Sequence, residues 1–395
     1  MALSVLHRVI LITALLAIAS CTSSPNQAVI SARAVTPIPA TTLAALDQIS
    51  SSRDAPILIR AYKKESEIEI WKQTKSGTFA LMKTYPVCRW SGQLGPKTHE
   101  GDRQVPEGFY TVTPSQMNPN SALWLAFNVG YPNAMERSLG RNGGDIMVHG
   151  TCSSRGCFAM TNEQIEEIYA VMRESFAGGQ KSIQFQSYPF HMTAENLAKF
   201  RNDPNLPFWK NLKEGSDRFE VTKVEPAVGY CGLRYTFGAT EAPGCGQTAA
   251  TDPAANAIAA KATADDAKIA SLVAGGLPPI HMSYADGDQN VTFQTPEKHA
   301  MLEKWAASGE LSRPEALWAV HETEIDSAGK PVSRRAATVT AFSATPALTT
   351  AATTQASNDS FFKKLLSAPE EPIAASEVEP LVGPTATVPL PPRRS

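Results

Sequence analysis

The sequence predicts a mainly β domain with flanking helices, followed by a largely disordered tail. Short runs rich in Ile, Val, Phe, Tyr and Thr recur between turn signals from residue 56 to residue 188, a pattern typical of short strands. A single helical pattern interrupts them, and an Ala, Thr, Pro and Ser rich sequence begins near residue 241. The expected strands are 56–62, 66–71, 78–87, 108–114, 123–130, 145–150 and 181–188.

The interrupting helix is expected over residues 162–176, where Thr161 can cap its first turn. Its apolar residues fall on one face at helical spacing, which favours packing against the sheet. These residues are Ile165, Ile168, Tyr169 and Met172. Further along, residues 192–220 suggest two short helices and residues 232–237 a closing strand.

The first twenty residues resemble an export signal. A weakly basic start precedes an apolar run that is short for a membrane span, and small residues follow. The run ends in Ile-Ala-Ser-Cys, which is similar to the lipobox of bacterial lipoproteins, where the cysteine, here Cys21, is lipidated. Thr22 follows, which favours the outer membrane. We therefore expect a periplasmic protein held by a lipid anchor in a membrane.

Composition divides the 395 residues into five segments. We expect a signal peptide at 1–20, a tether at 21–50, a catalytic body at 51–190, appended helices and a closing strand at 191–240, and the tail at 241–395. The tail has too few apolar side chains to offset the entropy of ordering it. No catalytic motif follows Thr248. Deletion of the residues after Thr248 is therefore expected to leave catalysis unchanged.

Charge and cysteine content limit the possible classes of function. The formal net charge is -2 and no dense Lys/Arg run occurs, so a nucleic-acid partner is excluded. In an oxidising compartment cysteines tend to be lipidated, catalytic or paired in disulfides. The six cysteines are Cys21, Cys88, Cys152, Cys157, Cys231 and Cys245.

The stretch IMVHGTCSSRGCFAM, residues 146–160, carries the chemistry. A cysteine acts as a nucleophile when a base or a positive environment generates its thiolate. His149 can serve as the base for Cys157, and Arg155 adds positive charge nearby. Gly156 has the backbone freedom to turn N–H groups toward a developing oxyanion. A Cys/His hydrolase or acyltransferase is therefore the leading interpretation.

Two alternatives remain open from the residues alone. His149, Cys152 and Cys157 can together form a metal site, for which His99 or Cys88 would supply a fourth ligand. The same residues can also form a structural cluster without chemistry.

The blocks HGTCSSRGCFAM and GPKTHEGDRQVPEGFY resemble the catalytic region of the YkuD-type L,D-transpeptidases, which share an H-G followed by [S/T]-x-G-C. The extra cysteine after the histidine and the later YPFHMTAENLAKF are similar to the YafK-like branch. The resemblance covers residues 51–237 and implies a β-sandwich-like catalytic domain. It favours the cysteine enzyme over the metal site, and neither a metal nor another cofactor is expected.

The resemblance implies a role for each residue of the motif. Cys157 would be the acylated nucleophile and His149 the general base, with its imidazole held by the carbonyl of Gly150. The N–H groups of Gly156 and Cys157 would line the oxyanion hole.

Substrate contacts are expected from Asp102, Arg141 and Arg155, of which the arginines can hold a carboxylate. Two departures from the family pattern affect this expectation. The usual second histidine upstream of the H-G is missing, and Ala159 stands in place of an arginine.

Four cysteines remain if Cys21 is lipidated and Cys157 is catalytic, and they allow three disulfide pairings. We expect Cys231 with Cys245 because they are close in sequence. Cys88 would then pair with Cys152, since the family places the region after Cys88 near the active-site loop. A competing redox role would instead join Cys152 to Cys157.

The resemblance implies that the substrate is a peptidoglycan stem peptide, attacked at its diaminopimelate carbonyl. Transfer of the resulting acyl group to an amine makes the protein a murein L,D-transpeptidase. The first alternative is hydrolysis, as an amidase or L,D-carboxypeptidase that releases diaminopimelate-linked protein or D-Ala, with a murein-linked lipoprotein as a possible partner. The second alternative is a wall-binding lipoprotein without activity.

Overall fold

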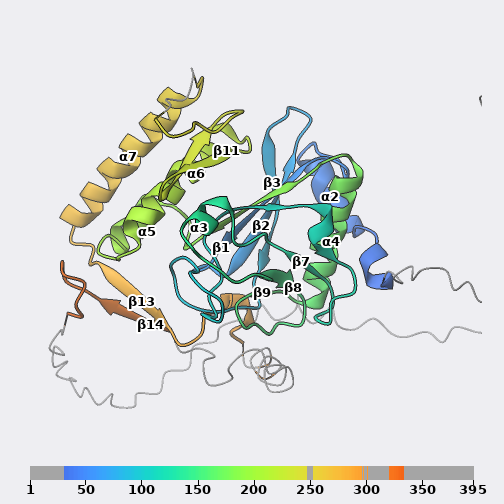
Figure 1. Cartoon of the computed structure of the whole chain (residues 1–395), viewed down its shortest axis with the longest axis horizontal. Coiled ribbons are helices and arrows are strands. Elements are labelled where there is room, and N and C mark those ends of the chain that lie inside the picture. The colour runs from blue at the N-terminus through green and yellow to red at the C-terminus, as the bar shows by residue number, and fades with distance from the viewer. Residues whose placement is uncertain (1–30, 247–251, 296, 298–299, 301–319, 333–395) are drawn as a thin grey trace, which may run out of the picture. The chain divides into compact units, whose positions relative to one another are not determined.

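The computed structural model describes residues 31–246, 252–295, 297, 300 and 320–332. Two five-stranded sheets and several helices make up the body (Figure 1). Among the described helices, none is both long and apolar enough to cross a bilayer. The predicted signal peptide and Cys21 lie outside the described residues.

The first sheet contains the early strands of the sequence in the order β3-β2-β1-β10-β5. β1 pairs antiparallel with β2 and parallel with β10, so Ile59 lies opposite Ile70 on one side and Phe185 on the other. The strands are β1 (Ile57–Tyr62), β2 (Glu67–Gln73), β3 (Phe79–Pro86), β5 (Gly108–Val112) and β10 (Ile183–Tyr188).

The second sheet carries the catalytic motif and has the order β4-β9-β8-β7-β6. Its strands are β4 (Arg89–Trp90), β6 (Met117–Asn118), β7 (Ala126–Asn128), β8 (Met147–His149) and β9 (Phe158–Ala159). The buried rings of Phe127 and Phe158 lie 6.3 and 5.9 Å from that of Phe185 in the first sheet. The two sheets therefore share one core, which confirms the predicted sheet-rich fold.

Helix α4 (Asn162–Ala177) has the predicted start, because the Thr161 side chain accepts a hydrogen bond from the Gln164 N–H. Its predicted apolar face is buried. It follows β9 directly, so it fixes the chain just after the nucleophile motif (Figure 1). A short helix, α3 (Ala134–Ser138), lies between β7 and β8.

The appended segment forms α5 (Ala194–Lys199), α6 (Leu206–Thr222), and the antiparallel pair β11 (Ala227–Cys231) and β12 (Arg234–Gly238). The closing strand lies where the sequence places it, but α6 is longer than the short helix expected. Trp209 of α6 is fully buried and its indole N–H donates to Glu107 Oε2 at 2.8 Å. The appended helices therefore share a core with the catalytic body.

The tether boundary at residue 50 is wrong. Residues 32–48 form η1 (Ala32–Val35) and α2 (Ala40–Gln48), and Leu46 is buried. Arg173 of α4 donates to the carbonyls of Ala34 at 2.7 Å and Thr36 at 3.0 Å. Isolated apolar residues in an Ala/Thr-rich stretch gave no periodic signal, although tertiary contacts are enough to fix these helices.

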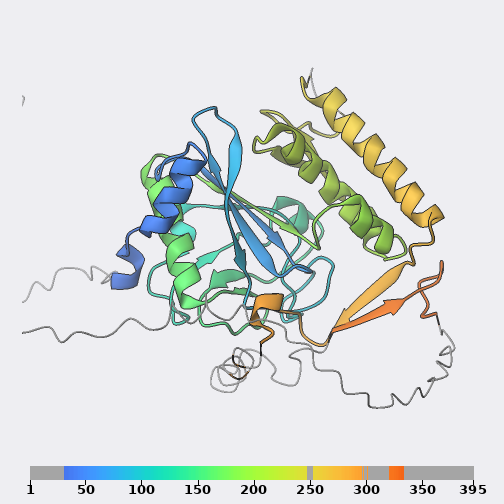
Figure 2. The same cartoon turned by 180° about the vertical axis from the view of Figure 1, so that it is seen from behind.

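The start of the expected disordered tail at residue 241 is also wrong. Residues beyond it form α7 (Ala255–Ala274), the antiparallel pair β13 (Ile280–Tyr284) and β14 (Val320–Glu324), and η3 (Val291–Phe293) (Figure 2). Tyr284 and Phe293 are buried. Low-complexity composition therefore did not mark the end of the folded part. The rest of the predicted tail, residues 333–395, lies outside the described residues.

Candidate active site

Two neighbouring strands bring the motif together. β8 ends at His149, and β9 begins directly after Cys157. The strands pair in parallel, with Val148 opposite Phe158 and His149 opposite Ala159. Because side chains alternate along a strand, this register directs the side chains at positions 157 and 149 to the same face. The predicted nucleophile and base therefore lie on the same face of the β8–β9 pair.

His149 is held in one defined state. Its ring is 2% exposed, and Nδ1 lies 2.6 Å from the Gly150 carbonyl oxygen, the contact that the sequence predicts. A carbonyl only accepts hydrogen bonds, so Nδ1 carries the proton and the neutral ring keeps its lone pair on Nε2. Burial lowers the pKa of His149 to about 4, against a smaller opposing effect of the Gly150 carbonyl. His149 is therefore a neutral base at neutral pH.

Gly150 has to be a glycine for steric reasons. A Cβ at this position would lie 2.7 Å from Asn162 Oδ1 and 2.8 Å from Trp124 Cβ. The Gly150 N–H donates to the carbonyl of Leu123 at 3.0 Å. These contacts fix the peptide whose carbonyl orients His149.

Cys157 is half-buried and is the free cysteine among the described residues. Burial is the largest influence on its thiol and raises its pKa. The N–H of Met147 donates to Sγ at 3.4 Å and opposes this effect, as does the positive charge of Lys97. The resting site thus holds a protonated thiol at Cys157 and a neutral imidazole at His149.

The predicted oxyanion donors face a serine in this structure. The hydroxyl oxygen of Ser154 accepts from the N–H groups of Gly156 at 3.2 Å and Cys157 at 3.0 Å, and it donates to the Cys157 carbonyl at 2.7 Å. Gly156 has a φ of +118°, which favours glycine. These amides therefore have a partner that an oxyanion would have to replace. Sequence reasoning missed Ser154, although it is the serine of the S-x-G-C pattern.

Asp102 organises a loop beside the nucleophile. Its carboxylate accepts from Lys97 Nζ at 2.5 Å and from the backbone N–H groups of Thr98 at 3.0 Å and Gln104 at 3.0 Å. Although burial opposes it, these bonds lower the pKa of Asp102. The Asp102 carboxylate is therefore occupied within its own loop rather than open to substrate as predicted. Lys97 was not singled out in the sequence, where it is one lysine among many.

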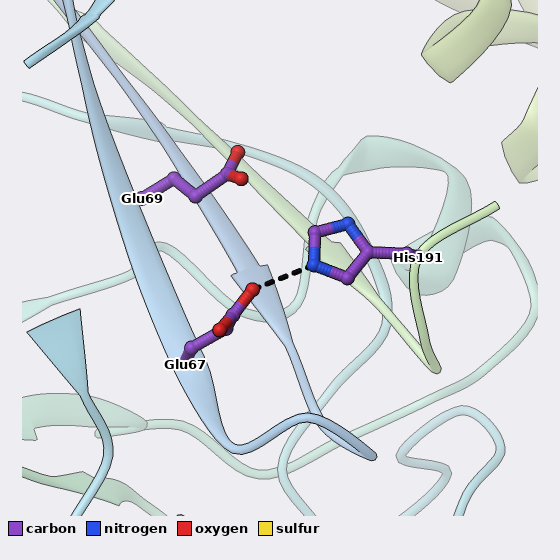
Figure 3. Close-up of side chains that lie close together, drawn as sticks. All are labelled: Glu67, Glu69 and His191. Carbon is purple, nitrogen blue, oxygen red and sulfur yellow. Dashed lines mark hydrogen bonds and ion pairs between the residues drawn. The ribbon is translucent and has the colours of Figure 1, made fainter. Parts of the chain in front are cut away.

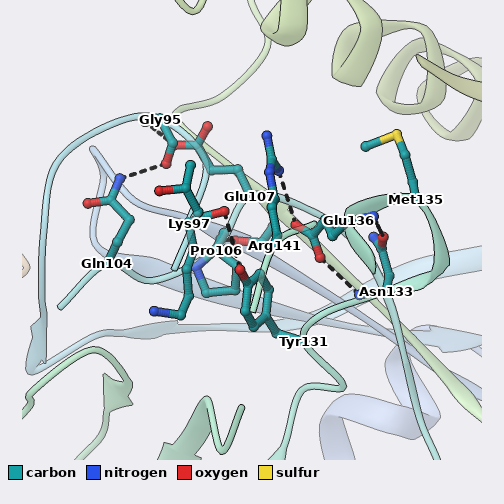
Figure 4. A network of polar contacts seen from close by, with 12 residues as sticks. Gly95, Lys97, Gln104, Pro106, Glu107, Tyr131, Asn133, Met135, Glu136 and Arg141 are labelled. Atoms are coloured by element: carbon teal, nitrogen blue, oxygen red, sulfur yellow. Dashed lines mark hydrogen bonds and ion pairs between the residues drawn. The ribbon is translucent and has the colours of Figure 1, made fainter. Parts of the chain in front are cut away.

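Arg141 pairs with a buried carboxylate. Its guanidinium lies 3.5 Å from Glu136 (Figure 4). Glu136 also accepts a hydrogen bond from the Tyr110 hydroxyl at 2.8 Å. Arg141 also lines a cavity of about 530 Å³ together with Pro96 and Phe208. Arg155 is exposed in the loop that leads to Cys157. Substrate binding by either arginine stays a prediction.

Two disulfides join the cysteines in the expected pairs. Cys88 bonds to Cys152 with a Cα–Cα distance of 5.1 Å, and Cys231 bonds to Cys245 at the same distance. The first bridge ties the 150–157 loop to the chain just before β4. Because this bond occupies the Cys152 sulfur, the alternative metal site of His149, Cys152 and Cys157 is wrong.

A different cluster within the described residues has the spacing of metal ligands, namely Glu67, Glu69 and His191 (Figure 3). Each ligand atom already has a protein partner. His191 Nε2 lies 2.6 Å from Glu67, and Glu69 accepts from the indole N–H of Trp71 at 2.8 Å. These contacts account for the cluster as two polar interactions, one between His191 and β2 and one within β2.

The fold and this site define an enzyme of the L,D-transpeptidase class. Residues 59–181 match the YkuD L,D-transpeptidase catalytic domain. Over 182 residues the chain is 40% identical to the Escherichia coli K12 protein named "Putative L,D-transpeptidase YafK", an alignment covering 46% of this chain and 73% of that protein. The O157:H7 protein of the same name matches equally. The chain therefore belongs to the YkuD L,D-transpeptidase family, whose function is peptidoglycan-related.

The matches among solved structures include proteins of Campylobacter jejuni and Bdellovibrio bacteriovorus. The helical cell shape determining protein Pgp2 of Campylobacter jejuni has 17% identity and a TM-score of 0.28, covering 48% of this chain and 80% of Pgp2. Bd1075 of Bdellovibrio bacteriovorus has 13% identity and a TM-score of 0.25, covering 48% of this chain and 88% of Bd1075.

Proposed function

We propose that the protein forms a thioester between Cys157 and the diaminopimelate carbonyl of a peptidoglycan stem peptide, and that it then transfers this acyl group to an amine. The observation that carries the proposal is the state of His149. Its Nδ1–H donates to the Gly150 carbonyl at 2.6 Å, which leaves the Nε2 lone pair as the proton acceptor on the face that Cys157 shares.

The proposed first half-reaction moves one proton twice. The Cys157 thiol gives its proton to His149 Nε2 as the sulfur attacks the carbonyl carbon and the C–S bond forms. The C–N bond to the terminal D-Ala then breaks, and the imidazolium returns the proton to the leaving amine. Because the pKa of His149 is lowered by burial, the imidazolium is a strong acid that readily protonates this amine.

The acceptor in the second half-reaction decides the product. A side-chain amine of another stem peptide gives a cross-link, and water gives a free carboxylate. Hydrolysis remains the alternative function, since Ala159 replaces the arginine usual in the family and the upstream histidine is missing. In that case the substrate would include diaminopimelate joined to a lipoprotein. Without activity, the protein would be a wall-binding lipoprotein.

We also propose that the enzyme is periplasmic and anchored by a lipid on Cys21, most consistently in the outer membrane. Two disulfides fit an oxidising compartment. Labelled palmitate should enter the wild-type protein and not Cys21→Ser. Equal labelling of both would contradict lipidation at this residue.

Product analysis tests the reaction. The full-length protein is incubated with defined tetrapeptide muropeptides and, separately, with lipoprotein-linked peptidoglycan, and the products are identified by mass spectrometry. Cross-linked dimers support transfer, whereas tripeptides or freed lipoprotein support hydrolysis. Cys157→Ala should abolish both products, and Cys231→Ala, which alters a cysteine outside the motif, should retain them. Turnover by Cys157→Ala would contradict the proposal.

A further inference from the structure

A strap of ten residues, 284–293, lies against the catalytic sheet although it is far outside the family match at 59–181. Its backbone pairs with the chain around β4: Asn290 N–H donates to the Val87 carbonyl at 3.0 Å, and Gly287 N–H donates to that of Gly92 at 2.8 Å. β4 is the edge strand of the second sheet, and its other neighbour is β9. The strap therefore covers the edge of β4 that faces away from β9, the strand that follows Cys157.

Close contacts fix the strap in this position. Gly287 has a φ of +73°, and a Cβ there would lie 1.9 Å from the Trp90 carbonyl oxygen, so only glycine allows this approach. The ring of Tyr284 contacts that of Trp90 at 5.1 Å. Phe293 packs with the buried Cys88 and Cys152. The strap thus reaches both β4 and the disulfide that holds the nucleophile loop.

Asp286 is the residue of the strap whose carboxylate contacts Arg103. It is 3% exposed, its carbonyl accepts from Arg89 at 2.7 Å, and its carboxylate binds the Arg103 guanidinium, with Nε 3.3 Å from Oδ1 and Nη2 on Oδ2. This two-point contact restricts both the position and the orientation of the arginine.

The backbone of Arg103 lies near Gly156, the residue that precedes Cys157. The φ of +55° at Arg103 is an uncommon backbone conformation that needs support from its surroundings. A Cβ on Gly156 would lie 3.6 Å from both the Cα and the carbonyl carbon of Arg103. These are ordinary van der Waals distances for a Cβ, and the three atoms nearest to its position all belong to Arg103. Apart from the neighbours of Gly156 in the chain, the Arg103 backbone is therefore the segment nearest to this side of Gly156.

We propose that Asp286 is a positioning residue, which holds Arg103 against Gly156 and so keeps the Cys157 thiol at the N–H of Met147. The kinetic part of this inference rests on the proposed thioester chemistry. The thiol geometry does not, because the Met147 N–H bond to Sγ at 3.4 Å exists without substrate. Loss of the carboxylate releases Arg103, weakens that bond and makes the thiolate less stable.

The test measures the reactivity of the Cys157 thiol directly. Full-length wild type, Asp286→Ala and Asp286→Asn are alkylated with iodoacetamide across a pH series, and modification of the tryptic peptide that begins at Gly156 is quantified. In both variants the midpoint should rise by about 0.5 pH unit, which corresponds to roughly threefold slower alkylation below the midpoint. Val291→Ala is the matched control, since Val291 lies on the same strap and is 72% exposed.

Turnover gives the second readout. Asp286→Asn should lower kcat about tenfold with little change in KM, because the proposed defect is in positioning rather than in substrate binding. The double variant with Arg103→Ala should be no worse than Arg103→Ala alone, because both changes act on one contact.

An alkylation profile and kcat equal to those of wild type in a folded Asp286→Asn protein would overturn the proposal, as would additive effects in the double variant. If Asp286→Ala does not fold, the isosteric Asp286→Asn decides. If wild type alkylates normally but turns over no muropeptide, the proposed function fails while the thiol measurement still tests Asp286.

Discussion

Acidification should leave the first half-reaction active well below the ordinary pKa of histidine. Burial lowers the pKa of His149 from 6.5 to about 4, a preference of roughly 3 kcal/mol for the neutral ring. Protonated His149 cannot accept the thiol proton, so the rate of thioester formation falls as pH drops through the pKa. At pH 5 about nine-tenths of the base remains available with a pKa near 4, against about 3% with an unshifted pKa.

The assay is single-turnover thioester formation with a tetrapeptide muropeptide between pH 3.5 and 8. His191→Asn is the control. Burial is the largest single effect on His191 and lowers its pKa, but the neighbouring carboxylates of Glu65, Glu67 and Glu69 together outweigh burial and raise it. The variant should have the same acid limb as wild type. An acid limb near pH 6.5 in both proteins would refute the assignment of His149 as a buried, neutral base.

The same shift makes a prediction about stability. Since the folded-state pKa of His149 lies below the unfolded value, the unfolded chain binds the proton first as pH falls. The contribution of the neutral His149 ring to the free energy of unfolding is fully present above about pH 6.5. It is lost as the pH falls from there to about pH 4. Because burial raises the pKa of Glu225 to about 7 and that of Asp288 to about 6, the loss is measured as the difference in urea unfolding free energy between wild type and His149→Gln across this range. A difference independent of pH would contradict the prediction.

Five further variants test the residues that support the site. Glu107→Ala leaves the fully buried Lys63 without its carboxylate partner at 2.9 Å and should cost about 4 kcal/mol of unfolding free energy. Glu107→Gln keeps a hydrogen-bond acceptor and should cost less, and an unchanged unfolding free energy in Glu107→Ala would contradict the ion pair. Ser154→Ala removes the acceptor of two amides and should cost about 2 kcal/mol in urea unfolding, whereas an unchanged midpoint would show that the amides find other partners. Cys88→Ser opens a bridge across 64 residues, which should cost about 4 kcal/mol and lower turnover, while Cys231→Ser should leave turnover near that of wild type. Activation of the enzyme by reductant would instead support the competing redox role.

The sequence predicts the first sheet well because each strand carries its own signal. β1, β2 and β10 are continuous or alternating apolar runs, and α4 has a cap and an apolar face. β4 and β9 have two residues each, so neither shows a period, and their pairing depends on partners elsewhere in the chain. Helix α7 was missed because its Ala-rich composition resembles a linker.

The site likewise has residues that the local sequence marks and residues that only distant contacts reveal. His149, Gly150 and Cys157 lie within nine residues, and their spacing around a strand end is itself the signal. Asp286 contacts Arg103 across 183 residues, and nothing local marks it. The expectation that residues after Thr248 are dispensable followed from the lack of a motif there. Given the strap, we now expect a deletion that removes residues 284–293 to reduce turnover.

The central claim is that Cys157 carries the acyl group. The most direct measurement is the mass of the full-length protein after brief incubation with a tetrapeptide muropeptide and an acid quench, followed by mapping of the peptide that contains Cys157. The account predicts an added mass equal to the substrate minus D-Ala, on Cys157, lost with hydroxylamine and missing in Cys157→Ala. An adduct on another residue, or product formation with no adduct in wild type and normal turnover in Cys157→Ala, would contradict it.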